Sequence, residues 1–245
     1  MKRYISSCLL YIFITNNLFT QTIEPSTGIA KNNLQLEFET LYSVEKEALQ
    51  KTTSWNIPNI LIRYGLSENI ELQLHTPFTK ERCFEDNELI ESIFKFDEIE
   101  IGLSLNLWEQ KNLIPEAALM ARIISSTNNL NLNNLGSIIS LNFSNSISEK
   151  LCLNYNIGTT TNLNKTTTGF YIVNLSYEPS SKIHFFIENL SDFTFNKTES
   201  NCLGAGFGFN LKGNLAIDFS IDKSLKHNLI FTGAILTWVI NTKKS

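Results

Sequence analysis

The sequence contains no run of roughly 18 or more apolar residues beyond its N-terminal stretch, which argues against a membrane-spanning helix in the mature chain. Charged residues make up only 18% of the chain, whereas about 25% is usual for soluble globular proteins. Proline is scarce, and aliphatic and aromatic residues are spread through the whole sequence. Such a composition excludes a disordered protein and fits one large all-β domain or two small ones.

Cysteine and positive charge are also scarce. Beyond Cys8, the three cysteines Cys83, Cys152 and Cys202 are an odd and scattered set without a C-x-x-C pair, which excludes a disulfide framework and a zinc site of that kind. The formal net charge is −4, and without the first 20 residues 18 basic residues remain against 24 acidic ones. This acidic balance argues against nucleic acid as a partner.

The N-terminus has the features of an export signal. Lys2 and Arg3 precede the apolar stretch Tyr4–Ile14, and a more polar stretch follows with a cleavage site expected near Thr20. We therefore expect a signal peptide over residues 1–20, followed by a short N-terminal periplasmic segment over residues 21–32.

The rest of the sequence is dominated by alternation of apolar and polar residues. Asn59–Tyr64 and Glu98–Leu107 are clear examples, and such alternation is typical of strands with one apolar and one polar face. Beyond the signal region, helical spacing occurs only in Glu85–Phe94, where we expect a turn or two of helix within a loop. The pattern predicts twelve strands, near residues 33–44, 54–65, 69–78, 96–107, 113–125, 136–144, 150–160, 167–178, 182–190, 200–210, 214–222 and 228–240.

The connections between these strands alternate between short turns and longer polar stretches. The stretch GLSENIELQL, which begins at Gly65, has counterparts near residues 147, 179 and 211. Short turns of this kind close hairpins, whereas connections such as 45–53 and 77–95 are long. The alternation predicts an up-and-down barrel with both termini on the side of the short turns.

Three features indicate that the apolar face contacts lipid. The polar face carries charges on many strands, and the apolar face carries almost none. Glycine gathers on the polar face, where it suits a closely packed lumen. With the export signal, these features predict a transmembrane up-and-down antiparallel β-barrel over residues 33–241, with a C-terminal tail at 242–245, in the outer membrane of a Gram-negative cell. Outer-membrane lipid and the barrel-assembly machinery are its expected partners. The glycines concerned are Gly102, Gly158, Gly204, Gly206 and Gly208.

Several stretches resemble a known family. QLEFETLYS (35–43), IPNILIRYGLSENIELQL (57–74), IEIGLSLNLWEQKNLIPEAAL (99–119) and GAILTW (233–238) are similar to outer-membrane β-barrel proteins to which transport in the meta-pathway of phenol degradation is ascribed. The resemblance implies an outer-membrane barrel with a transport role, and it supplies no catalytic residues.

The polar face predicts a lumen lined by charges. A turn with its tip at residues 66–68 places Arg63 opposite Glu71, and a similar register in a later hairpin places Glu100 opposite Arg122 and Asn106 opposite Glu116. Such a network fixes a plug or constriction, favours cations, or only satisfies charges inside a narrow barrel. The expected charge network is Glu37, Arg63, Glu71, Glu98, Glu100, Glu116 and Arg122, and the other expected polar lumen residues are Asn59, Gln73, His75, His184 and Glu188.

These features favour a narrow channel or transporter for small solutes over an enzyme. Six residues on the nominal inner face are apolar and either contact a hydrophobic or aromatic solute or fill the barrel. No G-x-S-x-G motif accompanies the three histidines, so we expect neither catalysis nor a cofactor or metal site. Two alternatives stay open, namely a structural or surface-interaction barrel and a secreted soluble β-barrel that binds a ligand. The six apolar residues are Leu61, Met120, Phe170, Ile172, Phe186 and Ile235.

Overall fold

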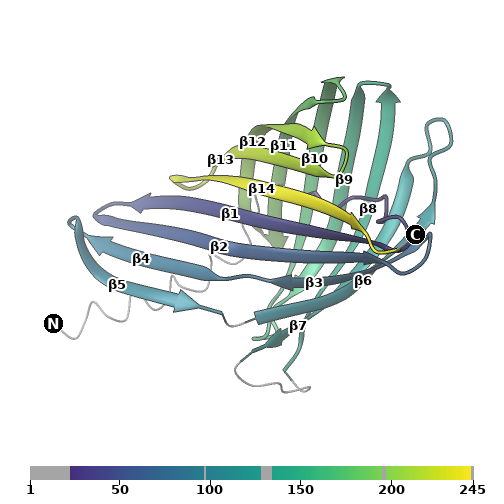
Figure 1. The fold of residues 1–245 in the computed structure, drawn as a ribbon. Helices are drawn as coiled ribbons and strands as arrows, with labels where there is room; N and C mark the ends of the chain where they lie inside the picture. The colour runs from purple at the N-terminus through teal and green to yellow at the C-terminus, as the bar shows by residue number, and fades with distance from the viewer. Residues whose placement is uncertain (1–22, 97, 128–133, 195–196, 244–245) are drawn as a thin grey trace.

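The computed structural model describes residues 23–96, 98–127, 134–194 and 197–243, and the expected signal peptide lies outside these residues. Fourteen β-strands form one antiparallel sheet (Figure 1). No helix in the described part of the chain is long and apolar enough to cross a membrane. The strands are β1 (Asn33–Glu47), β2 (Gln50–Gly65), β3 (Ile70–Thr76), β4 (Thr79–Glu85), β5 (Glu88–Lys95), β6 (Glu98–Trp108), β7 (Glu116–Ser126), β8 (Gly136–Ser148), β9 (Leu151–Thr161), β10 (Thr167–Ser180), β11 (Ile183–Thr194), β12 (Lys197–Lys212), β13 (Leu215–Ser224) and β14 (Leu229–Asn241).

The sheet closes on itself because β1 pairs with both β2 and β14. The short strands β3 and β4 pair with successive parts of β2, so together they occupy one position around the barrel. In the same way, β6 pairs with β3 and β5 pairs with β4. The result is a closed up-and-down barrel of twelve strand positions, as the sequence pattern predicts.

The prediction of a helical turn in Glu85–Phe94 was wrong. The expected loop 77–95 is mostly a hairpin of β4 and β5, with Thr79 opposite Lys95 and Glu85 opposite Glu88. The hairpin pairs with residues 50–56 of β2, whereas β3 pairs with residues 60–65, so the hairpin extends the barrel wall beyond β3 and β6 (Figure 1). Pairing with β4 satisfies backbone N–H and C=O groups of β2 that would otherwise lack partners. These hydrogen bonds stabilise the hairpin more than the helical spacing of apolar residues would stabilise a helix.

The two rims of the barrel differ. The rim that carries the β2–β3, β8–β9, β10–β11 and β12–β13 turns is called here the short-turn rim, and the start of β1 and the end of β14 lie on it. The opposite rim, called here the far rim, carries the tips of the β1–β2 and β4–β5 hairpins and the connections at 162–166 and 225–228. The expected long connection at 45–53 is also mostly strand, because β1 runs to Glu47 and β2 begins at Gln50.

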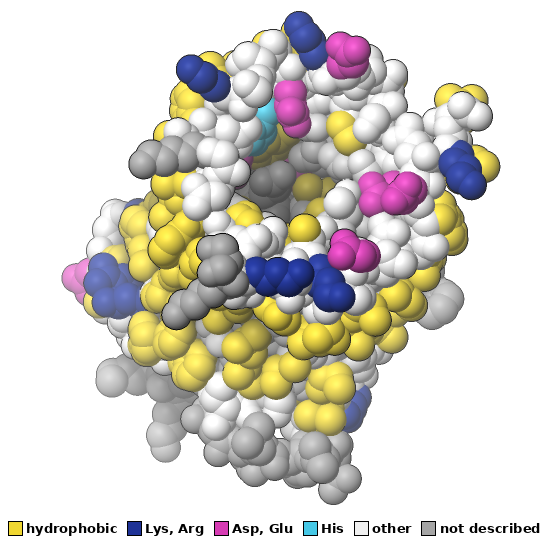
Figure 2. Space-filling view, turned by 45° about the vertical axis from the view of Figure 1, so that its right-hand side comes forward, with side chains coloured by type: hydrophobic (Ala, Val, Ile, Leu, Met, Phe, Trp, Pro, Cys, Tyr) yellow, Lys and Arg dark blue, Asp and Glu magenta, His cyan; other side chains and the backbone are white. Residues whose placement is uncertain are grey.

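The outer surface of the barrel is apolar and its interior is polar. Outward side chains such as Ile101 and Ile157 are 59% and 53% exposed, whereas inward Glu71 is only 1% exposed. Figure 2 shows hydrophobic side chains gathered on the outer surface below a hollow whose edge carries charged ones. This distribution is the reverse of that in a soluble protein and matches a barrel that contacts lipid.

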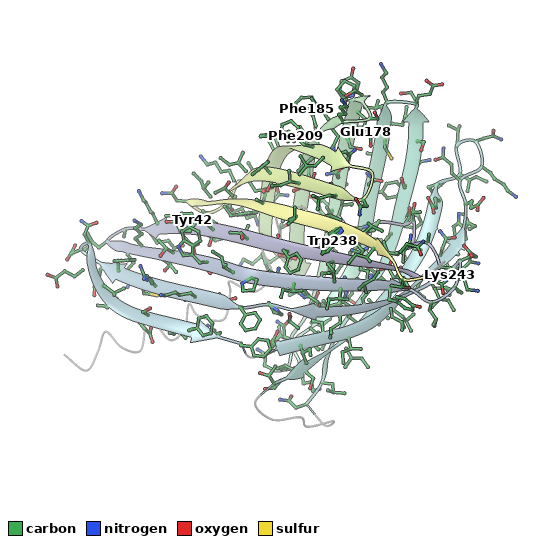
Figure 3. The ribbon with its side chains drawn as sticks, viewed as in Figure 1. Tyr42, Glu178, Phe185, Phe209, Trp238 and Lys243 are labelled. Carbon is green, nitrogen blue, oxygen red and sulfur yellow. The ribbon has the colours of Figure 1, made fainter. Side chains whose placement is uncertain are left out.

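Aromatic side chains lie at two levels of β1 and its neighbouring strands. Near the short-turn rim is Trp238, which pairs with Leu36 of β1 (Figure 3). Six residues further along β1 is Tyr42, whose ring centroid lies 4.3 Å from that of Trp55. At about 3.4 Å per residue the two levels are about 20 Å apart along the strand. Strands of such barrels are tilted by about 35–45°, so the two levels differ in height by about 15 Å and lie within an apolar band of about 25 Å.

The inward glycines make room for lumen side chains of neighbouring strands. A Cβ atom on Gly102 would lie 2.5 Å from Cγ of Arg122, and one on Gly204 would lie 1.7 Å from Oδ1 of Asp222. Both distances are too short for non-bonded atoms, so these positions need glycine for space rather than for backbone conformation. The prediction of a closely packed lumen beside these glycines is confirmed.

Candidate functional site

Arg63 lies at the centre of the charge network. It points inward from β2 and its side chain is only 5% exposed. Its Nε lies 2.9 Å from Oε1 of Glu37, its Nη1 lies 3.5 Å from Oε1 of Glu71, and its Nη2 donates to Oε2 of Glu24 at 2.8 Å. A buried guanidinium needs such partners because desolvation without them is costly.

Arg122 of β7 completes the network from the neighbouring wall. Its Nη2 donates to Oε1 of Glu24 at 2.5 Å, and its Nη1 lies 3.4 Å from Oε2 of Glu100. Its Nε donates to Oε1 of Gln73 at 2.7 Å. Glu100 also lies 3.1 Å from Nδ1 of His75.

Further hydrogen bonds hold the partners of the two arginines in place. Gln73 donates to Oε1 of Glu71 at 2.7 Å. His75 lies with its Nε2 2.6 Å from Oδ1 of Asn59, and Asn59 donates in turn to Oε2 of Glu39. Because these inward side chains on β1, β2 and β3 bond to one another, the two arginines are held in defined positions.

The expected register of this region was wrong by two residues. Gln73 lies opposite Arg63, and Glu71 lies opposite Gly65. Likewise Arg122 lies opposite Gly102 instead of Glu100. The β2–β3 turn takes four residues, with the N–H groups of Leu66 and Ser67 both bonded to the carbonyl of Ile70. A shift of two residues keeps every side chain on its own face. Diagonal contacts therefore still join Arg63 to Glu71 and Arg122 to Glu100.

The residues Ile23–Ala30, called here the N-terminal segment, cross the lumen beside this network. Besides its bonds to both arginines, Glu24 donates its N–H to Oδ1 of Asn156 at 2.8 Å and accepts from Nδ2 of Asn156 at 2.9 Å. The N–H of Ile29 donates to Oε2 of Glu71 at 2.9 Å. Residues from Ile23 onward, expected to form a periplasmic segment, are thus bonded to the inner wall.

Further contacts hold the middle and the end of the N-terminal segment. Asn106 donates to the carbonyl of Ser26 at 3.2 Å and to Oε1 of Glu116 at 2.8 Å. Glu116 accepts from the hydroxyl of Thr27 at 3.0 Å. A Cβ atom on Gly65 would lie 2.4 Å and 2.3 Å from the carbonyl oxygens of Ile29 and Ala30, so glycine leaves room for the segment at the short-turn rim.

Besides Glu116, three of the expected site residues lie away from the two arginines. Glu98 lies opposite Ser126, at the end of β6 nearer the far rim. His184 lies near the short-turn rim with its Nε2 2.6 Å from Oδ1 of Asp218. Glu188, which accepts from Nδ2 of Asn174 at 3.3 Å, belongs with His184 to the β10–β13 wall. His184 and Glu188 therefore lie on a different part of the barrel wall from the two arginines.

Glu24 and Asn156 are site residues that no sequence pattern marks. Glu24 precedes the first strand, so no alternation marks it as inward. Asn156 is one of several asparagines at inward positions. Their pairing depends on β2, β7 and β9 meeting around one lumen, and no local pattern records that meeting.

A cavity of about 750 Å³ occupies the lumen between the N-terminal segment and the far rim. Its lining runs from residues at the far rim, such as Glu47 and Thr166, down to Glu24 and both arginines. On one side the lining is apolar, with Phe170 packed against both buried apolar clusters of the barrel. These clusters are Leu41, Ile172, Leu190, Cys202 and Phe231, and Met120, Ile124 and Ile138.

One group of side chains in the described part of the chain has metal-ligand geometry. Ligand atoms of Glu45, Glu47 and His227 lie within 4.8 Å of one another at the far rim. His227 is exposed and both glutamates are partly exposed. Exposed acidic groups commonly gather without a metal, so this geometry alone assigns no site. Cys83, Cys152 and Cys202 are free thiols.

Comparisons with solved structures show a shared barrel fold. The KdgM porin aligns with a TM-score of 0.54 and 8% identity, over 82% of this chain and 98% of that one. The same porin in complex with disordered oligogalacturonate aligns with a TM-score of 0.50, 8% identity and the same coverage. The translocator domain of the autotransporter NalP from Neisseria meningitidis aligns with a TM-score of 0.50 and 10% identity, over 92% of this chain and 90% of that one.

No curated protein sequence gives a significant match. A family model does match, and it covers residues 17–233, nearly the whole barrel. The matched range includes both arginines of the network, Asn156 and the N-terminal segment. The chain therefore belongs to the family described as "Putative MetA-pathway of phenol degradation".

Proposed function

We propose that this protein is a narrow outer-membrane channel for small solutes. The observation that carries the proposal is the cavity of about 750 Å³, which extends from the far rim down to Glu24 and the two arginines. A cavity of this size suits a small molecule. The outward apolar surface supports placement in a membrane, and a barrel of twelve strands leaves a smaller interior than the 16–18 strands of open porins.

The polarity of the rims supports an orientation. Barrels of the outer membrane have short periplasmic turns and longer outer connections. In this orientation the short-turn rim faces the periplasm and the cavity opens at the far rim toward the outside. A solute that enters from outside meets the cavity first and the N-terminal segment last.

The cavity lining supports solutes that are apolar in part. Phe170, Met120 and Ile138 present apolar surface beside the charged floor. Removing such surface from water favours a bound apolar group by about 25 cal/mol per Å². The family description, which refers to phenol degradation, agrees with hydrophobic or aromatic solutes.

A sealed structural barrel is the second candidate, and the N-terminal segment is the observation that favours it. Side chains of β2, β3, β6, β7 and β9 bond to this segment across the lumen. If these bonds never release, the barrel passes nothing. Flux measurements separate the two candidates.

Proteoliposome flux with a matched glycine pair tests the channel. Gly65→Ala places a methyl group against the carbonyls of Ile29 and Ala30, whereas Gly213→Ala in the β12–β13 turn meets nothing within 4 Å. We expect wild-type liposomes to take up small neutral solutes, Gly65→Ala to raise the uptake rate several-fold, and Gly213→Ala to match wild type. No uptake by either wild type or Gly65→Ala, in barrels that show heat-modifiable gel migration, would establish the sealed barrel instead.

A further inference from the structure

Glu24 is held in the lumen as a bound carboxylate ligand would be held. One carboxylate oxygen accepts from Arg63 at 2.8 Å and the other accepts from Arg122 at 2.5 Å. The two guanidinium groups come from different strands, β2 and β7, and converge on one carboxylate. Guanidinium pairs of this kind select carboxylates because charge-assisted hydrogen bonds are short and directional.

The two arginines do not depend on Glu24 for their positions. Arg63 keeps its ion pairs with Glu37 and Glu71, and Arg122 keeps Glu100 and Gln73. If Glu24 leaves, one Nη2 group on each arginine loses its acceptor while the guanidiniums stay in place. Buried donors without acceptors are costly, so the vacated position favours another carboxylate.

The same position is reached from the cavity and adjoins apolar surface. Glu24, Arg63 and Arg122 line the cavity floor. Ile138 lies directly opposite Arg122 in the β7–β8 register and belongs to a buried apolar cluster that Phe170 contacts. A molecule whose carboxylate meets the arginines therefore places its remaining atoms against Ile138 and Phe170.

The charge balance sets how such a ligand binds. Four carboxylates, those of Glu24, Glu37, Glu71 and Glu100, surround two guanidiniums. An additional anion in this cluster is repelled, whereas an anion that replaces Glu24 leaves the total charge unchanged. Binding is therefore an exchange of one carboxylate for another.

We propose that Arg63 and Arg122 form a carboxylate-binding subsite for small monocarboxylates with an apolar body, and that such a ligand displaces Glu24 and with it the N-terminal segment. This inference deepens the proposed channel function and rests on it. It assigns the solute class and gives the solute itself the role of releasing the segment.

Calorimetry on the purified full-length mature barrel in detergent tests the subsite, with hexanoate as probe and neutral hexanamide as its matched comparison. Glu24→Ala removes the internal competitor, and we expect it to bind hexanoate at least about tenfold more tightly than wild type. Hexanamide affinity stays equal in the two proteins. Adding Arg122→Gln to Glu24→Ala abolishes the gain.

Glu116→Ala is the control for loosening of the N-terminal segment alone, because Glu116 bonds to Thr27 and Asn106 and not to the two arginines. It keeps Glu24 as the competing carboxylate, so its gain in hexanoate affinity stays well below that of Glu24→Ala. Equal gains in Glu116→Ala and Glu24→Ala, or equal binding of hexanoate and hexanamide by Glu24→Ala, would overturn the subsite. Because binding is measured without a membrane, a barrel that binds hexanoate but shows no flux refutes the channel and leaves the subsite.

Hydrogen exchange of the wild-type barrel supplies a second test, which does not depend on whether a variant folds. The N–H groups of Glu24 and Ile29 donate to Asn156 and Glu71. Hexanoate at saturating concentration speeds the exchange of both groups, and hexanamide does not. Unchanged exchange of both N–H groups at saturating hexanoate contradicts displacement of the segment.

Discussion

At the scale of single residues, the lumen is organised around two buried guanidinium groups. Each arginine contacts Glu24 and further acceptors on neighbouring strands. Arg63 and Arg122 lie on the same face as Glu37, Glu71 and Glu100, because alternation along a strand fixes the face of each residue. Alternation does not assign the ion-pair partners, because these depend on strand register and on the N-terminal segment.

Replacing Arg63 by alanine is expected to destabilise the barrel strongly. The change leaves the carboxylates of Glu24, Glu37 and Glu71 without their shared cation, and breaking a buried ion pair on one side typically costs about 3–5 kcal/mol. Denaturant unfolding in lipid vesicles measures the loss. Arg82→Ala, at an exposed position of β4, is the matched control and changes stability by less than about 1 kcal/mol. Equal losses in the two variants would contradict a central role for Arg63.

At the scale of strands and turns, the β2–β3 hairpin shows how register escapes a sequence pattern. Three residues would separate Gly65 from its expected partner Asn69, and five separate it from its observed partner Glu71, so the two registers differ by two residues and keep the same faces. Hydrophobic alternation is satisfied equally by both. The choice depends on hydrogen bonds in the turn and on contacts with other strands.

Paired cysteines test this register directly. In a background without the native cysteines, Tyr64→Cys with Leu72→Cys places two directly opposite residues in reach of a disulfide, since their Cβ atoms are about 5 Å apart. Tyr64→Cys with Ile70→Cys, the pair opposed in the three-residue-turn register, is diagonal at about 7–8 Å and forms far less disulfide. Oxidation followed by mass analysis of alkylated thiols measures both yields. A higher disulfide yield for the second pair would contradict the observed register and support the one expected from the sequence.

At the scale of the whole molecule, the barrel is polar inside and apolar outside. The expected membrane location rests on this arrangement, and a secreted soluble barrel would show the opposite one. The β4–β5 hairpin adds height at the far rim on one side only (Figure 1). It contributes Glu81 and Ile90 to the cavity wall, so it belongs to the entrance of the proposed channel.

A charge on the outer surface tests contact with lipid. Ile157→Arg, near the middle of β9 where the side chain is 53% exposed, is expected to cost about 2–4 kcal/mol in lipid vesicles. Leu211→Arg, at a similarly exposed position by the short-turn rim, costs about 0–1 kcal/mol because it lies near the interface. Unfolding in vesicles of matched composition measures the two. Negligible costs for both would place the outer surface in water.

Local sequence patterns are enough to predict the twelve strand positions, the up-and-down order and the inward direction of the charged residues. These properties are local, because side chains alternate along a strand and short turns join neighbours. The register of the arginine pairs, the strand character of 79–95 and the entry of the N-terminal segment into the lumen depend on contacts between distant parts of the chain. Glu24 meets Arg63, Arg122 and Asn156 only after closure brings β2, β7 and β9 around one interior. Contacts between residues so far apart in the chain leave no periodic trace, so only the closed barrel reveals them.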